Sequence, residues 1–152
     1  MEDLADAITQ SNIPQVKTVL ISVITALAVY QVAMMAVGWG KVKLPFLKPR
    51  AASFAHRSVG DVIVPITLLV AWICYAYYGF GDGPEHAYDD EETRATIHAW
   101  AGAALLMVLA VKIIVVRWWR SLNRYLPHFG ITVFALLVVT WVTSAGDYLA
   151  RG

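Results

Sequence analysis

The chain has 152 residues, of which 59% are apolar and 15% are charged, and its formal net charge is +1. Soluble domains carry about 25% charged residues, and the polar part of this chain is too small to cover its long apolar segments. The composition therefore excludes an ordinary soluble globular domain.

Four nearly charge-free segments follow one another along the chain, at residues 19–38, 62–80, 95–116 and 129–146. Each approaches the roughly 20 residues that a helix needs to cross a bilayer core of about 30 Å. We therefore predict an all-α, integral membrane four-helix bundle that forms one domain over residues 1–152. Its helices are expected at about residues 17–39, 58–80, 93–119 and 128–147. Because the connections are short, consecutive helices are expected to be antiparallel neighbours.

Charged residues separate into two sets along this pattern. Nine of the twelve Lys and Arg lie in or beside the connections between helices 1 and 2 and between helices 3 and 4, and ten of the eleven acidic residues lie on the opposite side. Basic loops stay in the cytoplasm, so we predict a cell-membrane protein with cytoplasmic basic loops, and with both termini and the acidic loop outside. Beside membrane helices the basic loops indicate topology and lipid-headgroup contacts, and no nucleic-acid partner is expected.

The first sixteen residues carry three acids and no base, so no secretory signal peptide is expected. The single cysteine, Cys74, lies within the second predicted helix, which leaves no disulfide framework and no cysteine metal cluster. No Gly-rich phosphate loop and no serine-protease or zincin spacing is present, so no enzyme class is predicted.

Three histidines lie at membrane depth or at its edge. His56, followed by Arg57, begins the second helix; His98 lies about one turn into the third helix, near the outer boundary; and His128 lies at the inner end of the fourth. Ionisable residues at such positions are functional candidates. A histidine at a helix end can equally bind a headgroup or cap a neighbour without any cofactor.

Two of these histidines share a spacing. His98 is followed four residues later by Gly102, and His56 by Gly60, so each glycine lies on the same helix face as its histidine. A flat macrocycle lying against a helix needs such a gap, although helix packing alone also favours glycine.

Haem b suits histidines in an apolar bundle, because imidazole ligates the iron and Arg57 could pair with a propionate. Two ligating nitrogens must lie about 4 Å apart across the iron. His56 and His128 share the inner level and could meet. His98 is higher by roughly 25 Å, at about 1.5 Å per residue, so a haem there takes its second ligand from another chain or is five-coordinate.

Two motifs resemble succinate dehydrogenase cytochrome b subunits. The stretch from Ser53 through His56 and Arg57 to Gly60 is similar to the family's Ser-x-x-His-Arg-x-x-Gly motif, and His98 to Gly102 resembles its haem-ligand motif. The resemblance implies a quinone held by Ser53, His56 and Arg57, and a haem on His98. It covers helices 2 and 3, and the family's arginine after the second glycine is replaced by alanine here.

The whole chain also resembles small four-helix prokaryotic membrane proteins of unassigned function. Features expected in those proteins are a His-Arg entry to helix 2, a His-x-x-x-Gly in helix 3 and a closing Trp-x-Thr-Ser-Ala, here residues 141–145. We therefore expect a membrane subunit of b-type cytochrome character that transfers electrons or interacts with a quinone. The alternative is a cofactor-free structural or assembly subunit of a larger membrane complex.

The loop of residues 79–92 carries six carboxylates within eleven residues. Such a patch attracts a basic soluble partner, for example a small electron carrier, and speeds its encounter. The simpler explanation is a solvated hairpin that its acids keep outside.

Overall fold

The computed structural model describes residues 12–79 and 89–151. The described elements are, in order, α2 (Ile13–Gly38), α3 (Pro49–Tyr78), α4 (Asp89–Arg117), the 3-10 helix η1 (Arg120–Tyr125), α5 (Leu126–Trp141), the π-helical turn η2 (Val142–Gly146) and α6 (Asp147–Arg151). Four helical runs are long and apolar enough to cross a membrane, at Pro14–Gly38, Pro49–Tyr77, Thr93–Arg117 and Leu126–Ala150. The predicted all-α four-helix architecture is therefore confirmed.

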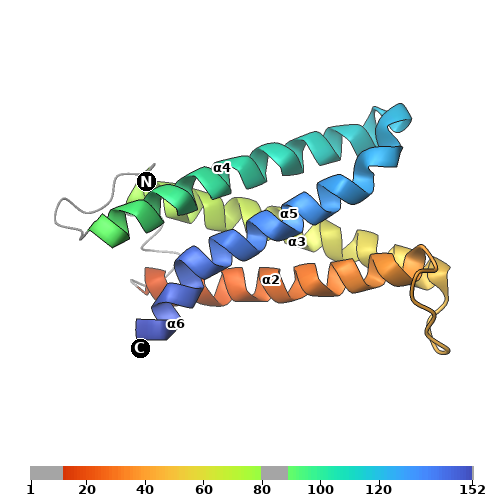
Figure 1. Ribbon diagram of the computed structural model, residues 1–152, viewed down its shortest axis with the longest axis horizontal. Coiled ribbons are helices and arrows are strands. Elements are labelled where there is room, and N and C mark those ends of the chain that lie inside the picture. The colour runs from red at the N-terminus through yellow and green to blue at the C-terminus, as the bar shows by residue number, and fades with distance from the viewer. Residues whose placement is uncertain (1–11, 80–88, 152) are drawn as a thin grey trace.

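The helices pack as two hairpins joined along one side. α2 packs against α3, α4 packs against α5, and α2 also packs against α5 (Figure 1). Within the described ranges, α3 and α4 share few close contacts, so the expectation that all consecutive helices are neighbours is not met. The small buried side chains Ala28 of α2 and Ala145 of η2 belong to the shared core, where small residues let membrane helices approach closely.

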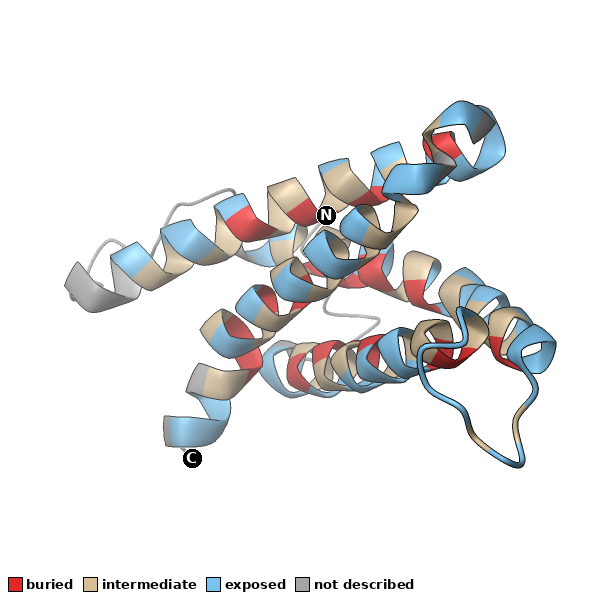
Figure 2. Ribbon diagram, turned by 45° about the vertical axis from the view of Figure 1, so that its right-hand side comes forward, coloured by how far each residue is buried: buried red, intermediate tan, exposed pale blue. Residues whose placement is uncertain are grey.

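Burial follows the two-hairpin arrangement. The main core cluster combines residues of all the long helices, among them Ile24, Val70, Leu105 and Leu137. Figure 2 shows buried residues on the inward faces and exposed residues around the outside. Large apolar side chains such as Met107 are among those exposed, as expected where the solvent is lipid.

Helix α3 begins at Pro49, nine residues before the predicted start. Proline is well tolerated in the first turn of a helix, where its missing N–H has no intrahelical partner to lose. The apolar run from which the start was predicted begins later than the helix itself. His56 and Arg57 consequently lie about two turns inside α3, and not at its first residue.

Both basic connections lie at the same end of the molecule (Figure 1). One is the segment of residues 39–48 between α2 and α3, and the other is η1 between α4 and α5. We call this end the basic end, and the end where α4 begins and α5 runs into η2 the opposite end.

The α2–α3 contact near the basic end depends on Gly38. A Cβ atom at Gly38 would lie 2.8 Å from Ser53 Oγ. The Ser53 hydroxyl can rotate away from a Cβ atom, but the branched side chain of Gly38→Val would also reach the α3 backbone, whose nearest atoms lie 3.7 Å and 3.8 Å from that Cβ. Gly38→Val should therefore destabilise the protein by about 1–3 kcal/mol, which a thermal unfolding scan in detergent would measure as a lowered Tm.

Gly130 in α5 provides the matched control, because no described atom lies within 4 Å of the position of its Cβ. Gly130→Val should leave the Tm nearly unchanged. Equal losses in the two variants would contradict the assignment of Gly38 to a close helix contact.

Candidate functional site

The most connected polar group in the described chain surrounds His98, near the opposite end. His98 Nδ1 lies 3.0 Å from the hydroxyl oxygen of Thr143. One turn earlier on α4, Arg94 donates a hydrogen bond from Nη1 to the backbone oxygen of the same threonine, at 2.6 Å. Two side chains of α4 therefore converge on one residue of η2.

The hydrogen bonds of Thr143 determine the tautomer of His98. The Thr143 hydroxyl has one hydrogen, and its nearest acceptor is the Val139 carbonyl oxygen at 2.8 Å. The hydroxyl oxygen is then left to accept from the ring, so Nδ1 of His98 carries the proton. Nε2 then keeps its lone pair.

Thr143 lies in the π-helical turn η2. In a π turn the backbone bonds span five residues instead of four. The Val139 carbonyl, one turn before Thr143, accepts from the Val142 N–H and from the Thr143 hydroxyl. Single π turns inside α-helices occur frequently at functional sites.

A side-chain hydrogen bond joins helices α2 and α5 beside this site. Trp141, the last residue of α5, donates from Nε1 to the Ser22 hydroxyl of α2 at 3.0 Å. Lys17 of α2 and Arg94 both act electrostatically on His98, and Lys17 acts in the same way on Cys74 of α3. Residues of α2, α4 and the α5–η2 run thus lie near the His98 imidazole, and two of them are cationic.

Gly102, one turn after His98, lies against open space. No described atom comes within 4 Å of the position that a Cβ would take there. The helix surface beside His98 is therefore open at this glycine, as the surface of α5 is at Gly130.

The second His-x-x-x-Gly motif has different surroundings. Gln31 of α2 donates from Nε2 to the backbone oxygen of His56 at 2.8 Å, and His56 Nδ1 lies 3.2 Å from the backbone oxygen of Gln31. A Cβ at Gly60 would lie 3.4 Å from Gln31 Nε2. The Gly60 gap thus faces the Gln31 side chain, and Ser53 lies against Gly38 in the same helix contact.

The other two predicted residues at the basic end are exposed. Arg57 points away from the core, and His128 lies near the start of α5 with its ring centroid 6.4 Å from that of Tyr125. Among the described residues no group of three His, Cys, Asp or Glu side chains could hold a metal ion.

The contacts also fix the levels of the three histidines along the bundle. His98 lies beside Thr143, fifteen residues after His128 on the same helical run, which is about 22 Å along the axis. His56 lies beside Gln31, nine residues along α2 from the Ser22 partner of Trp141, or about 13 Å. The structure brings none of the three imidazoles together, and α3 and α5, which carry His56 and His128, are not close neighbours among the described helices.

Most of the acidic loop lies outside the described residues, which resume at Asp89 in the first turn of α4. The predicted docking of a basic soluble partner on this loop therefore stays a prediction.

Sequence reasoning missed two residues that define these contacts, Gln31 and Thr143. Gln31 is the one side-chain amide in the apolar run of residues 19–38, and an isolated amide at membrane depth indicates a polar partner on another helix. Thr143 belongs to the Trp-x-Thr-Ser-Ala segment, whose role the sequence alone does not indicate. The structure shows that this segment forms most of the π turn.

The fold and the site define the class of this protein. It is an all-helical, membrane-type bundle with a polar cluster around a histidine. The chain belongs to the family of unknown function DUF6529, whose model matches residues 4–151. No curated protein matches the chain. No solved structure matches it either.

The hydrogen bonds predict the tautomers of the histidines. In 15N-labelled protein at alkaline pH, NMR of the side-chain nitrogens should find the proton of neutral His98 on Nδ1, because Thr143 accepts there. Thr143→Val keeps the shape but removes the acceptor, so His98 should shift towards the Nε2–H form.

His128 is the internal control, since its exposed ring has no comparable acceptor among the described residues. Its nitrogen signals should be the same in both proteins. Nε2–H on His98 in the unmodified chain would contradict the assigned network.

Proposed function

We propose that this chain is a membrane-bound b-type haem protein that transfers electrons, with His98 as an iron ligand near the opposite end. The observation that carries the proposal is the hydrogen bond between His98 and the Thr143 hydroxyl. It holds the proton on Nδ1 and leaves Nε2 as a donor atom for a metal, which is the usual arrangement for a metal-ligating histidine.

The surroundings of His98 fit a haem in three respects. The imidazole has a fixed orientation, because Thr143 is itself held by the backbone of its helix. Gly102 leaves open space one turn away, on the face where a macrocycle would lie. Lys17 and Arg94 supply positive charge at the same level, which suits propionates.

The geometry also limits the ligand set. His56 and His128 lie about 13 Å and about 22 Å from the level of His98, so neither can share its iron within one chain. Among the three described histidines, His98 alone would therefore ligate this iron. Haem b, when bound, supplies reversible one-electron chemistry.

Three residues then have defined roles at the proposed haem site. Nε2 of His98 binds, Thr143 orients the imidazole through Nδ1, and Arg94 holds the π turn against α4. By the positive-inside rule we place the basic end in the cytoplasm and the His98 site towards the outer face.

A structural or assembly subunit is the second candidate, and a specific observation favours it. Ser53, His56 and Gly60, three residues of the motif that resembles a quinone site, all lie in the α2–α3 contact and meet Gly38 or Gln31. A cofactor-free bundle would need these contacts just as much.

Absorption spectroscopy distinguishes the two candidates. Protein purified in detergent from haem-sufficient cells should show an intense Soret band that shifts on reduction. His98→Ala should abolish the band, whereas His128→Ala, a matched loss of one imidazole at an exposed position, should retain it.

Gly102→Leu should also abolish the band by filling the gap, whereas Gly130→Leu, at another open glycine, should keep it. A colourless unmodified protein, or a band that survives His98→Ala, would exclude the haem site on His98. A colourless protein would favour the structural subunit.

A quinone at the basic end is a separate proposal that depends on Arg57. The exposed guanidinium offers a planar pair of donors to a carbonyl, which lysine does not. Arg57→Lys should therefore lower quinone reduction several-fold at unchanged expression. Unchanged quinone reduction would leave Arg57 with a topological role.

A further inference from the structure

The connection between α2 and α3 is a hydrogen-bonded turn at the basic end. Gly40, with φ of 67°, reverses the chain after α2, and the backbone N–H groups of Lys41 and Val42 both donate to the Ala36 oxygen. Leu44 and Leu47 then pair across a tight turn, Leu47 N donating to Leu44 O at 3.3 Å. The turn therefore has a defined backbone conformation.

Apolar contacts fix this turn onto the helices. Leu44 and Leu47 pack against a second core cluster formed by Met34, Val37 and Ala52. Phe46, at the tip of the turn, is 81% exposed. A phenylalanine so exposed beside the ends of membrane helices suits the lipid interface, where its ring would be buried.

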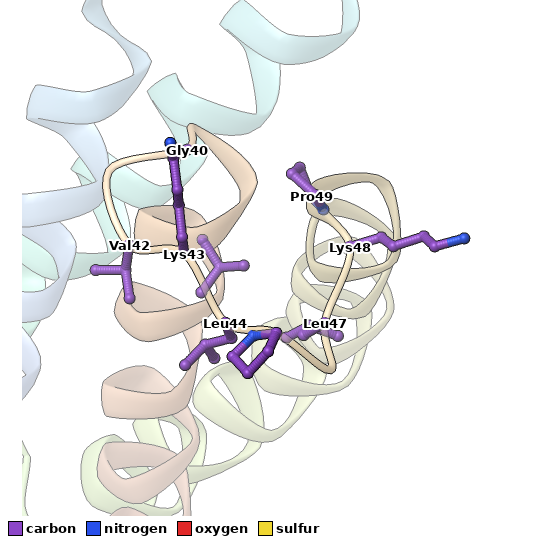
Figure 3. Close-up of a pocket in the computed structure, with 9 residues that line it drawn as sticks. Gly40, Val42, Lys43, Leu44, Leu47, Lys48 and Pro49 are labelled. Carbon is purple, nitrogen blue, oxygen red and sulfur yellow. The ribbon is translucent and has the colours of Figure 1, made fainter.

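The turn encloses a half-open pocket of about 340 Å³ (Figure 3). Its lining combines apolar walls with two lysines, and consists of Val37, Gly40, Val42, Lys43, Leu44, Pro45, Leu47, Lys48 and Pro49. In Figure 3 the Lys48 side chain extends away from the turn, and its amine lies well apart from that of Lys43, which runs toward Gly40. Among the described residues that line the pocket there is no carboxylate to neutralise the two lysines.

We infer that this pocket binds one anionic phospholipid. The headgroup phosphate lies at Lys43, and the start of an acyl chain lies against Val37, Leu44 and Leu47. Lys48 adds positive charge beside the pocket. The pocket sits at the end of two membrane-spanning helices, which is the level of the headgroups, and basic pockets at this level are suited to anionic lipids.

A lipid fits better than a free phosphate or a peptide. A free phosphate would use the lysines but none of the apolar wall. A partner peptide would leave the neighbouring exposed ring of Phe46 without a role, whereas the bilayer interface at this level would bury that ring. The inference does not depend on haem, since the pocket and His98 lie at opposite ends of the bundle.

Two double variants test the site with the same change of charge. Lys43→Ala with Lys48→Ala removes the lysines that line the pocket, whereas Lys41→Ala with Arg50→Ala removes two exposed cations of the same region that do not line it. Each protein is purified in detergent and incubated with phosphatidylglycerol, phosphatidylcholine or inorganic phosphate. Native mass spectrometry then measures the retained lipid, and thermal unfolding measures the shift in Tm.

The unmodified protein should retain one phosphatidylglycerol and gain Tm with it, but not with phosphatidylcholine or inorganic phosphate. The pocket variant should bind phosphatidylglycerol at least about tenfold more weakly, because each lysine contributes roughly 1 kcal/mol near an anionic headgroup. The control variant should lose less than about threefold, as expected for general surface charge.

A third variant keeps the lysines. Val42→Phe places a larger side chain at an exposed position of the lining and should also prevent lipid retention. Equal losses in the two charge variants, retention by Val42→Phe, or an equal Tm gain from inorganic phosphate would each overturn the lipid site.

Discussion

A bilayer core contains no water, so a polar side chain within it must find its hydrogen bond inside the protein. This constraint explains most of the side-chain hydrogen bonds in the described bundle, with Thr18 Oγ1 and Gln31 Oε1 as buried exceptions. Thr25 and Thr67 bond to carbonyls four residues earlier on their own helices, and so need no neighbour. Larger polar groups cannot do this, and their bonds reach from one helix to the next.

These longer bonds set the register of the helices. Gln31 and His56 join α2 to α3, Trp141 joins α5 to α2, and Arg94 and His98 join α4 to the π turn. Apolar packing alone allows helices surrounded by lipid to slide along one another, because a lipid tail is as apolar as leucine. Directional hydrogen bonds do not allow this sliding, so they fix the position of each helix along its packed neighbour.

The sequence was sufficient for the helices, their membrane character and the gathering of both basic connections at one end, because these follow from length, hydropathy and charge. It was insufficient for the pairing of helices, since α2 and α5 are far apart in the chain and their contact depends on tertiary packing. The start of α3 was predicted too late because helix formation, unlike membrane burial, does not require an apolar run, and Pro49 is well placed in a first turn.

The two His-x-x-x-Gly motifs show where sequence spacing stops being informative. Both histidines have Nδ1 next to a hydrogen-bond acceptor, and both glycines lie one turn away. The difference lies on the neighbouring helix, which the motif does not contain. Opposite Gly60 is Gln31, long enough to fill the gap, whereas opposite Gly102 there is no described atom within 4 Å. The same spacing therefore serves helix packing in α3, whereas in α4 it lies against open space.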